Sequence, residues 1–207
     1  MYSIHDFGFF LASCVILNLP PGTDTFYILG RSISHGRSAG VASVLGISSG
    51  AMVHTFAAAI GLSAVLAASA TAFWAVKLLG ASYLVYLGVR MLLAHPSASA
   101  LPTDFSSSNF FAAYRQGLLT NVLNPKVVLF FLAFVPQFIS ATSSKFLAFI
   151  TLGMCFVITS TLWCLCLVWF SSFLRSRLHG GSGFANVLNC TAGILFIFLG
   201  IRLAASK

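Results

Sequence analysis

Apolar runs of about 20 residues recur along the chain, and their length indicates membrane-spanning helices. An α-helix rises 1.5 Å per residue, so about 20 residues cross the roughly 30 Å hydrocarbon core of a bilayer. Four uninterrupted runs have this length, at 41–66, 71–93, 146–173 and 184–203. The chain is expected to turn at 31–37, 68–70, 95–109, 140–145 and 175–183.

Two further runs, 7–29 and 117–139, are interrupted near their middles by the sequences PPGTD at 20–24 and NVLNPK at 121–126. An interior proline removes a backbone donor and clashes with the preceding turn, which costs about 3 kcal/mol or more. Backbone groups left unpaired in hydrocarbon add to that cost. Both runs are therefore predicted to be broken helices whose unwound segments line protein or water.

The two halves of the sequence resemble each other. Asn18-x-x-Pro21-Gly22 recurs 103 residues later as Asn121-x-x-Asn124-Pro125, and LGVRM at 87–91 recurs 112 residues later as LGIRL at 199–203. Two matches in the same order indicate a duplicated three-helix unit, 1–103 and 104–207. Because three spans cross the bilayer an odd number of times, the second unit starts on the opposite side. The predicted fold is an all-α integral membrane protein of six transmembrane helices, a 3+3 inverted repeat in one membrane domain, with helices 1 and 4 broken.

Composition supports this fold and excludes other classes. Hydrophobic residues make up 58% of the 207 residues and charged residues only 7%, against roughly 25% charged in soluble domains. The net charge of +8 is scattered singly between apolar runs, without the basic stripe of a nucleic-acid-binding protein. The chain has no glutamate, no His-x-x-x-His motif and no Gly-x-Ser-x-Gly elbow. No enzyme, metal site, cofactor or nucleic-acid partner is therefore expected.

Basic residues give a modest indication of orientation. On one side of the expected membrane are five arginines, Arg31, Arg37, Arg115, Arg175 and Arg177. On the other side are three lysines, Lys77, Lys145 and Lys207. The positive-inside rule then places the odd-numbered turns in the cytoplasm and both termini outside.

Asp24 is the one carboxylate at membrane depth in the expected spans. An ionised aspartate near a helix centre costs about 2.5–3.5 kcal/mol on insertion scales, so a compensating role is expected. The functional interpretation is a site for a substrate ammonium or a proton, with Asn18, Pro21 and Gly22 beside it. The structural interpretation is a cap for the half-helix that begins after Gly22, because aspartate is favoured in a first helical turn.

The matching break contains Asn121, Asn124, Pro125 and Lys126. A freed helix N-terminus and a cation together suit an anionic group such as a carboxylate. The alternative is that Lys126 snorkels to the membrane interface. An ion pair between Lys126 and Asp24, across the two breaks, is a further hypothesis that the inverted repeat permits.

His54 lies near the middle of the second span, where a histidine can relay protons because it titrates near neutral pH. The alternative is a hydrogen-bonded core residue. The motifs Gly36-x-x-x-Gly40 and Gly46-x-x-x-Gly50 suit close helix packing, within one chain or in a homo-oligomer. The five cysteines, which lie in apolar stretches, are expected to behave as small hydrophobes; they are Cys14, Cys155, Cys164, Cys166 and Cys190.

Several motifs together resemble the lysine-exporter (LysE/RhtB-type) family of amino-acid effluxers over essentially the whole chain. They are PGTD at 21–24, GRSAG at 36–40 through GISSG at 46–50, LGASYL at 79–84, TNVLNPK at 120–126 and FLAFVPQF at 131–138. The Asn-Pro-Lys block followed by Phe-x-Pro-Gln-Phe is the most specific part. The family commonly has a second proline where this chain has Thr23, but Pro20, Pro21 and Gly22 remain and the break is expected to survive.

This resemblance implies a multi-pass exporter of amino acids in the bacterial inner membrane, driven by the proton gradient. The expected substrate lies between the two breaks, with Asp24 and Asn18 near its ammonium and Asn121, Asn124 and Lys126 near its carboxylate. Asp24 and His54 are the candidate proton-coupling groups. Because the site has a single acid, neutral amino acids such as homoserine, threonine or leucine are favoured over basic ones. The alternatives are a passive channel for small solutes and a membrane-embedded redox enzyme that uses the cysteines.

Overall fold

The computed structural model describes residues 4–64, 70–93, 109–140 and 145–171, together with nine positions between 190 and 205. The described residues form helices, and the one β-type contact among them is an isolated bridge between Ile4 and Ile139. The predicted all-α class is therefore confirmed. In chain order the elements are α1 (Phe7–Asn18), α2 (Thr23–Ala57), the π-helical η1 (Ala58–Leu62), α4 (Ala70–Leu93), α5 (Phe110–Val122), α6 (Pro125–Leu129), the π-helical η2 (Phe130–Phe134), the 3₁₀ helix η3 (Val135–Phe138) and α7 (Lys145–Trp169).

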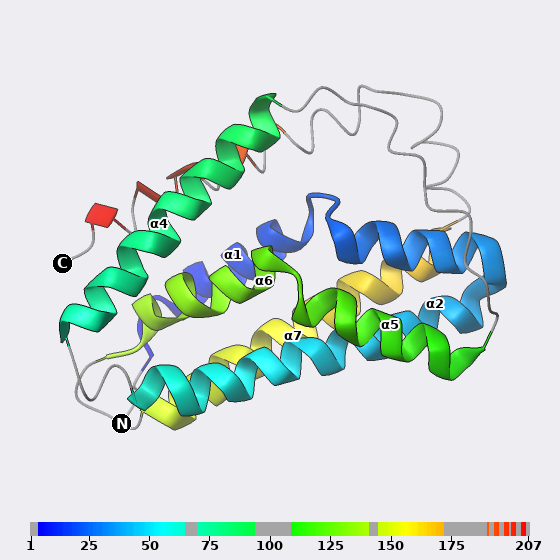
Figure 1. Cartoon of the computed structure of the whole chain (residues 1–207), viewed down its shortest axis with the longest axis horizontal. Helices are drawn as coiled ribbons and strands as arrows, with labels where there is room; N and C mark the ends of the chain where they lie inside the picture. Colours follow the sequence, from blue (N-terminus) through cyan, green and yellow to red (C-terminus); the bar gives the residue numbers. More distant parts are fainter. Residues whose placement is uncertain are drawn as a thin grey trace.

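The first predicted broken helix is present. Helix α1 ends at Asn18 and α2 begins at Thr23, so residues 19–22 interrupt the helix where Pro20 and Pro21 stand. Figure 1 shows α1 and the first part of α2 following one another along the long axis, with the interruption midway along the molecule. The unwound segment therefore lies deep between the two ends of the helix bundle.

Helix α2 doubles back at Gly36. This residue has φ 82° and ψ 176°, outside the helical region, in a conformation that glycine adopts without steric cost. The ribbon reverses direction there (Figure 1), and the Gly40 Cα faces the Ser32 side chain across the hairpin. Residues 23–35 and 37–57 are thus two antiparallel helical segments.

The expected basic turn at 31–37 is wrong in extent, because the helix continues to residue 35. Arg31 is only 3% exposed, and its Nη2 donates a 2.7 Å hydrogen bond to Gln116 Oε1 on α5. Its guanidinium also lies 5.8 Å from the centre of the Tyr27 ring. Arg31 is therefore not one of the loop charges on which the predicted orientation rests, which weakens that prediction.

The second predicted broken helix is also present, although it starts earlier than the sequence indicated. Helix α5 begins at Phe110, ahead of the expected residue 117, with the Asn109 side chain accepting from the Phe111 N–H as an N-cap. The path bends by 48° between α5 and the segment Pro125–Phe138. The bend falls at residues 123–124, directly before Pro125, as the proline predicts.

Among the described residues, two stretches are long and apolar enough to cross a membrane: Lys145–Trp169, and Thr23–Leu62, which consists of the two antiparallel segments of α2 and η1. The bent pair would be a third. Helix α1 and the stretch Leu78–Arg90 are shorter apolar helices. Most of the sixth expected span, 184–203, lies outside the described residues. The count of six spans therefore stays a prediction.

Large apolar side chains are exposed on the outer faces of the helices. Leu79, Leu123, Leu147 and Leu162 are 71%, 75%, 63% and 60% exposed. Soluble monomers rarely expose large contiguous apolar patches, whereas lipid tails solvate such side chains without cost. The exposed surface therefore fits a membrane protein.

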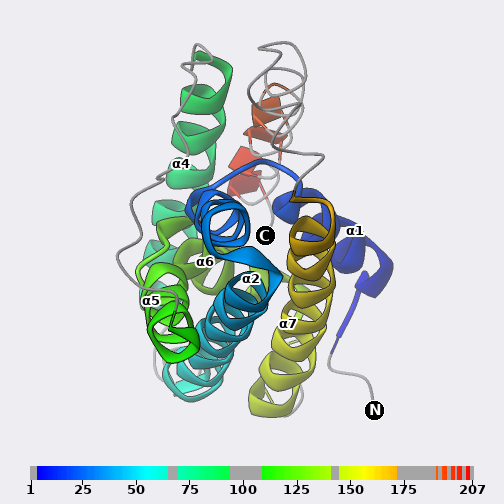
Figure 2. The same cartoon turned by 90° about the vertical axis from the view of Figure 1, so that its right-hand side faces the viewer.

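Helix α4 lies at one edge of the molecule, and the described C-terminal helical pieces lie beside it (Figures 1 and 2). The two segments approach closely because small residues face each other. A Cβ on Gly88 would lie 2.5 Å from the Gly193 carbonyl oxygen, and a Cβ on Gly200 would lie 2.8 Å from that of Ala81. Small residues at helix crossings are the usual way in which helices pack closely in membranes.

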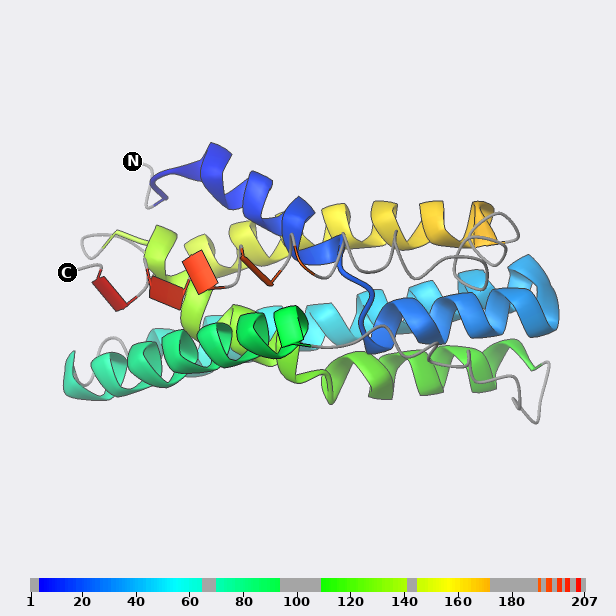
Figure 3. The same ribbon diagram turned by 90° about the horizontal axis from the view of Figure 1, so that it is seen from above.

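The second segment of α2 runs beside α5, and glycines bring their backbones together (Figure 3). A Cβ on Gly46 would collide with the Tyr114 carbonyl oxygen, and a Cβ on Gly117 would lie 2.6 Å from that of Ser43. Gly50 similarly faces the Asn121 side chain. The prediction of close packing is confirmed for Gly40, Gly46 and Gly50, while Gly36 makes the turn instead.

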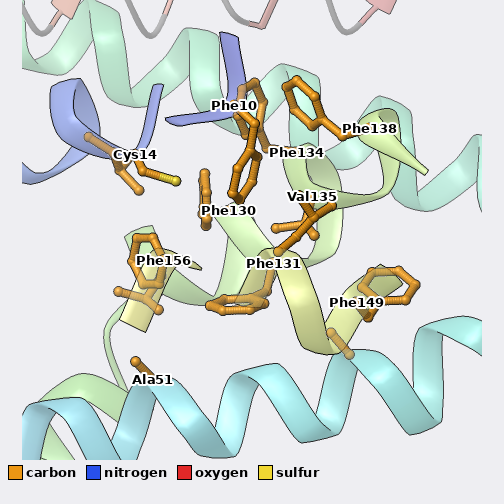
Figure 4. Close-up of a cluster of buried hydrophobic side chains, with 14 of the residues drawn as sticks. Phe10, Cys14, Ala51, Phe130, Phe131, Phe134, Val135, Phe138, Phe149 and Phe156 are labelled. Carbon is orange, nitrogen blue, oxygen red and sulfur yellow. The ribbon is translucent and has the colours of Figure 1, made fainter. Parts of the chain in front are cut away.

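Two apolar clusters fill the interior on either side of the breaks. One, here called the aromatic cluster, is built around Phe10, Phe130, Phe131, Phe134, Phe138, Phe149 and Phe156 (Figure 4). Its rings are in contact, with centroids 4.7 Å apart for Phe130 and Phe156. The other, here called the second apolar cluster, contains Tyr27, Ile28, Leu29, Val44, Ile47, Cys164, Leu167 and Val168.

We predict that Gly46→Ala destabilises the protein by about 1–3 kcal/mol, because the new methyl group overpacks the contact between α2 and α5. Gly8→Ala is the matched control: no atom lies within 4 Å of a Cβ at that helical position, so the usual gain of up to about 1 kcal/mol in helix propensity is expected. Thermal unfolding in detergent measures both. An equal effect of the two substitutions would contradict the packing at Gly46.

Candidate functional site

The two breaks meet at a cavity of about 30 Å³ that α7 also lines. Of the residues predicted for the site, Asn18, Gly22, Asp24, Asn124 and Lys126 line it. Pro21, Asn121, Pro125 and His54 do not line it. The structure thus brings the polar side chains of both breaks together, although they are about 100 residues apart in the sequence.

Asp24 is held by the opposite break. Its Oδ2 accepts a 2.8 Å hydrogen bond from Asn121 Nδ2. Its other carboxylate oxygen, Oδ1, is buried and has no hydrogen-bond partner among the described residues. Because a buried carboxylate is costly in hydrocarbon, this arrangement leaves one oxygen ready to accept from a cation or a proton.

His54 is connected to Asp24 through Asn121. Its Nε2 lies 3.2 Å from the Asn121 carbonyl oxygen, and since a carbonyl only accepts, Nε2 must carry the hydrogen. The ring also stacks on Phe131, with centroids 5.9 Å apart. The alternative interpretation of a hydrogen-bonded core histidine thus fits the geometry of His54. The histidine is nevertheless linked to the Asp24 carboxylate, because both form hydrogen bonds with Asn121.

Asn124 satisfies the start of α6. Its Oδ1 accepts from the Lys126 N–H at 3.0 Å, and its carbonyl oxygen accepts from the N–H groups of Val127 and Val128. Pro125 has no N–H to offer. The freed helix N-terminus that the sequence predicted as an anion site is therefore occupied by Asn124.

Lys126 contributes its side chain to the cavity. Its Nζ donates to the Pro20 carbonyl oxygen at 3.5 Å, so it reaches the unwound segment of the first break. The ion pair between Lys126 and Asp24 stays a hypothesis. The two charged groups line one small cavity and are near enough to act on each other.

Helix α7 supplies a wall of the cavity that sequence reasoning missed: Phe156, Ser160, Trp163 and Cys164. An unbroken apolar helix gives no signal of its own, and apart from the redox alternative for the cysteines these residues had no predicted role. Their spacing of three to four residues puts them on one helical face, but only the fold shows that this face is turned inward. The Trp163 Nε1 and the Asn18 Nδ2 are buried without a partner among the described residues.

The cavity lies where the two apolar clusters meet. Leu17, Val127 and Phe156 line it from the aromatic cluster, and Cys164 lines it from the second apolar cluster. A volume of about 30 Å³ matches one water molecule, whereas a dry cavity that holds benzene has about 150 Å³. The cavity is therefore too small for an amino acid in this conformation, and a ligand of that size requires the surrounding helices to separate.

Comparison with known families gives one match over most of the chain. The model of the family described as LysE type translocator matches residues 15–207. No solved structure matches this chain.

Curated relatives match along nearly their whole length. The membrane protein YrhP of Bacillus subtilis is 29% identical, over 98% of this chain and 100% of the relative. A leucine efflux protein of Salmonella typhimurium is 27% identical, over 98% of this chain and 96% of the relative. A leucine efflux protein of Klebsiella pneumoniae is 29% identical, over 94% and 92%.

We predict that Asn121→Ala destabilises the protein by about 1–3 kcal/mol, because it leaves the Asp24 carboxylate buried without its donor. In an Asp24→Ala background the same change should cost less, by at least about 0.5 kcal/mol, since the two residues are in direct contact. Unfolding of the four proteins in mixed micelles measures this coupling. Thr120→Ala, which removes only a bond back to Gln116 in the same helix, is the control and should show no coupling to Asp24.

Proposed function

The chain belongs to the LysE type translocator family, and we propose that it exports neutral amino acids across the bacterial inner membrane in exchange for protons. Membership of a translocator family makes it a transporter and not an enzyme, so the cysteine redox alternative is set aside. The observation that carries the proposal is the cavity between the two breaks, which the Asp24 carboxylate and the Lys126 ammonium both line. A small cavity with one acid and one base is complementary to a zwitterion.

The proposed substrate pose follows from the donors and acceptors of the cavity. The unpartnered Asp24 Oδ1, with Asn18 beside it, accepts from the substrate ammonium. Lys126 donates to the carboxylate, and Asn124 and Asn121 hold the backbone and the acid in place. Pro21, Gly22 and Pro125 shape the two breaks. The leucine efflux proteins among the relatives support an amino acid as substrate, and the apolar lining of Leu17, Val127 and Phe156 suits an aliphatic side chain.

An inverted repeat of 1–103 and 104–207 is part of the proposal, and contacts near the C-terminus support it. A Cβ on Gly88 would touch Gly193 and Ile197, whereas a Cβ on Gly200 would touch Ala81 and Val85. The internal sequence match pairs Gly88 with Gly200, 112 residues apart. Subtracting 112 from 193 and 197 gives 81 and 85, so the repeat exchanges the two sets of contacts, as a two-fold axis between the repeats would.

Six spans and alternating access complete the proposed mechanism. The breaks would occupy equivalent positions in the two repeats, and one repeat would rock against the other. Opening on one side of the membrane would pull apart the helices that meet in the aromatic cluster. Opening on the other side would pull apart the helices that meet in the second apolar cluster. Each rearrangement would expose the same cavity to one aqueous phase. The conformation described here would be the intermediate between the two open states.

Proton coupling is proposed to run through Asp24, with His54 as the second candidate group. The chain of hydrogen bonds from Asp24 to Asn121 to His54 links the two. A proton on Asp24 removes the charge that binds the substrate ammonium, so protonation and substrate binding compete at Oδ1. Such competition is what an exchange of proton for substrate requires.

Counterflow in proteoliposomes tests the function. Vesicles preloaded with unlabelled L-leucine should transiently accumulate labelled L-leucine above its equilibrium level, and L-lysine should compete weakly because the cavity has one acid. A passive channel, the second candidate from the sequence, would equilibrate the label without an overshoot. Absence of counterflow for leucine, threonine, homoserine and lysine alike would refute an amino-acid exporter.

We further predict that Asp24→Asn uncouples transport from the proton gradient without unfolding the protein. Asparagine keeps the volume of aspartate and an oxygen that accepts from Asn121, but it cannot titrate. In inverted vesicles, leucine counterflow should persist at raised leucine concentrations, because the charge that binds the ammonium is lost, whereas uptake driven by an imposed pH gradient should fall by at least about 10-fold, as loss of a coupling worth 1.4 kcal/mol or more implies.

The control for this substitution is Asp6→Asn, which removes an exposed carboxylate beside His5 at the start of α1. It should leave both activities near wild type. If pH-driven uptake by well-inserted Asp24→Asn protein matched wild type, Asp24 would not be the coupling group, and His54 would be tested next.

A further inference from the structure

We propose that Trp163 binds the substrate, with its indole N–H donating a hydrogen bond to the carboxylate of the exported amino acid. The proposal rests on the function proposed above, because it assigns a residue to the same cavity. It adds α7 to a site that the sequence and the two breaks had limited to α1, α2, α5 and α6.

The indole nitrogen of Trp163 makes no hydrogen bond in this conformation within the described part of the chain. Trp163 lines the cavity together with Asp24 and Lys126, and its Nε1 is buried without an acceptor in the described part of the chain. A buried donor that stays unpaired costs free energy, so native proteins rarely keep one without a reason. A phenylalanine at this position would fill similar space without that cost. The unpaired N–H is therefore explained by a partner that enters the cavity.

The chemistry of the indole N–H identifies the substrate group that it binds. The indole N–H only donates, so it cannot bind the substrate ammonium. An aliphatic amino acid has one group that accepts hydrogen bonds, its carboxylate. The substrate atom that Trp163 meets must then be a carboxylate oxygen.

The substrate carboxylate needs hydrogen-bond donors in addition to Lys126. The N–H groups at the start of α6 are already bonded to Asn124, which leaves them unable to bind an anion. Two residues that line the cavity from other elements have a buried nitrogen donor without a partner among the described residues, Trp163 with Nε1 and Asn18 with Nδ2. Trp163 approaches from a helix outside both breaks, so a bound carboxylate would connect α7 to Lys126 and hold the cavity closed.

The test compares L-leucine with L-leucinol, which keeps the ammonium and the side chain but has a hydroxymethyl group in place of the carboxylate. Each is measured as an inhibitor of labelled leucine counterflow in proteoliposomes. In Trp163→Phe protein, leucine should bind on the order of 10- to 100-fold more weakly, as expected for loss of a hydrogen bond to a charged group. Leucinol should change less than threefold, so the preference of the wild type for leucine over leucinol should largely disappear.

Trp169→Phe is the matched control, because Trp169 lies on the same helix but is 60% exposed and lies outside the cavity. It should leave both ligands within twofold of wild type. Trp163→His, which keeps a ring N–H, should recover part of the discrimination. Equal weakening of leucine and leucinol by Trp163→Phe, or no weakening of either, would refute the proposed hydrogen bond.

A second measurement keeps Trp163 in place and does not depend on the folding of its variants. Trp163 is the sole tryptophan in Trp74→Phe/Trp169→Phe protein. Its fluorescence should change on saturation with leucine and not with leucinol. An unchanged spectrum with leucine would overturn the proposal. Wild-type protein without any amino-acid counterflow would instead refute the transport function itself, so the two failures are distinguishable.

Discussion

The hydrogen bond from Asn121 to the Asp24 carboxylate joins the two places where the helices of this protein are interrupted. At each interruption the backbone loses its helical partners inside a solvent that offers none. The rest of the central structure supplies the replacements: Lys126 donates to the Pro20 carbonyl, His54 donates to the Asn121 carbonyl, and Asn124 caps the helix that follows. Each break is thus stabilised largely by side chains that come from outside its own helix.

This mutual dependence explains why the cavity is both polar and small. Its polar lining comes from the breaks, and the aromatic cluster and the second apolar cluster adjoin it. Buried polar groups in a low-dielectric surrounding interact strongly, and the few that stay unpaired mark where a ligand gains most. The glycine contacts between α2 and α5 hold the helices close enough for Asn121 to reach Asp24. A ligand of amino-acid size therefore enters such a site only when the surrounding helices separate.

Much of this protein was predictable from the sequence, because few backbone structures can satisfy their hydrogen bonds within a bilayer. Long apolar runs with 7% charge gave the helical membrane class, and Pro20, Pro21 and Pro125 located both breaks, since proline acts locally on its own helix. Asp24 and Lys126 stood out as expensive charges, and the motifs around Asn124 indicated the family that residues 15–207 match. In each case the signal was a residue whose placement in hydrocarbon costs free energy whatever the tertiary fold.

The tertiary structure decided what depends on which faces meet. Arg31 looked like a loop charge until its helix was seen to continue to residue 35 and bury it against Gln116. Asn124 caps the start of α6, where the sequence suggested an anion site, and Asp24 accepts a hydrogen bond from Asn121, a partner that the sequence did not indicate. Trp163 carried no signal, because the inward face of an unbroken apolar helix is set by its neighbours alone. Local backbone chemistry is written in the sequence, whereas the partner of each polar side chain is fixed only by packing between distant segments.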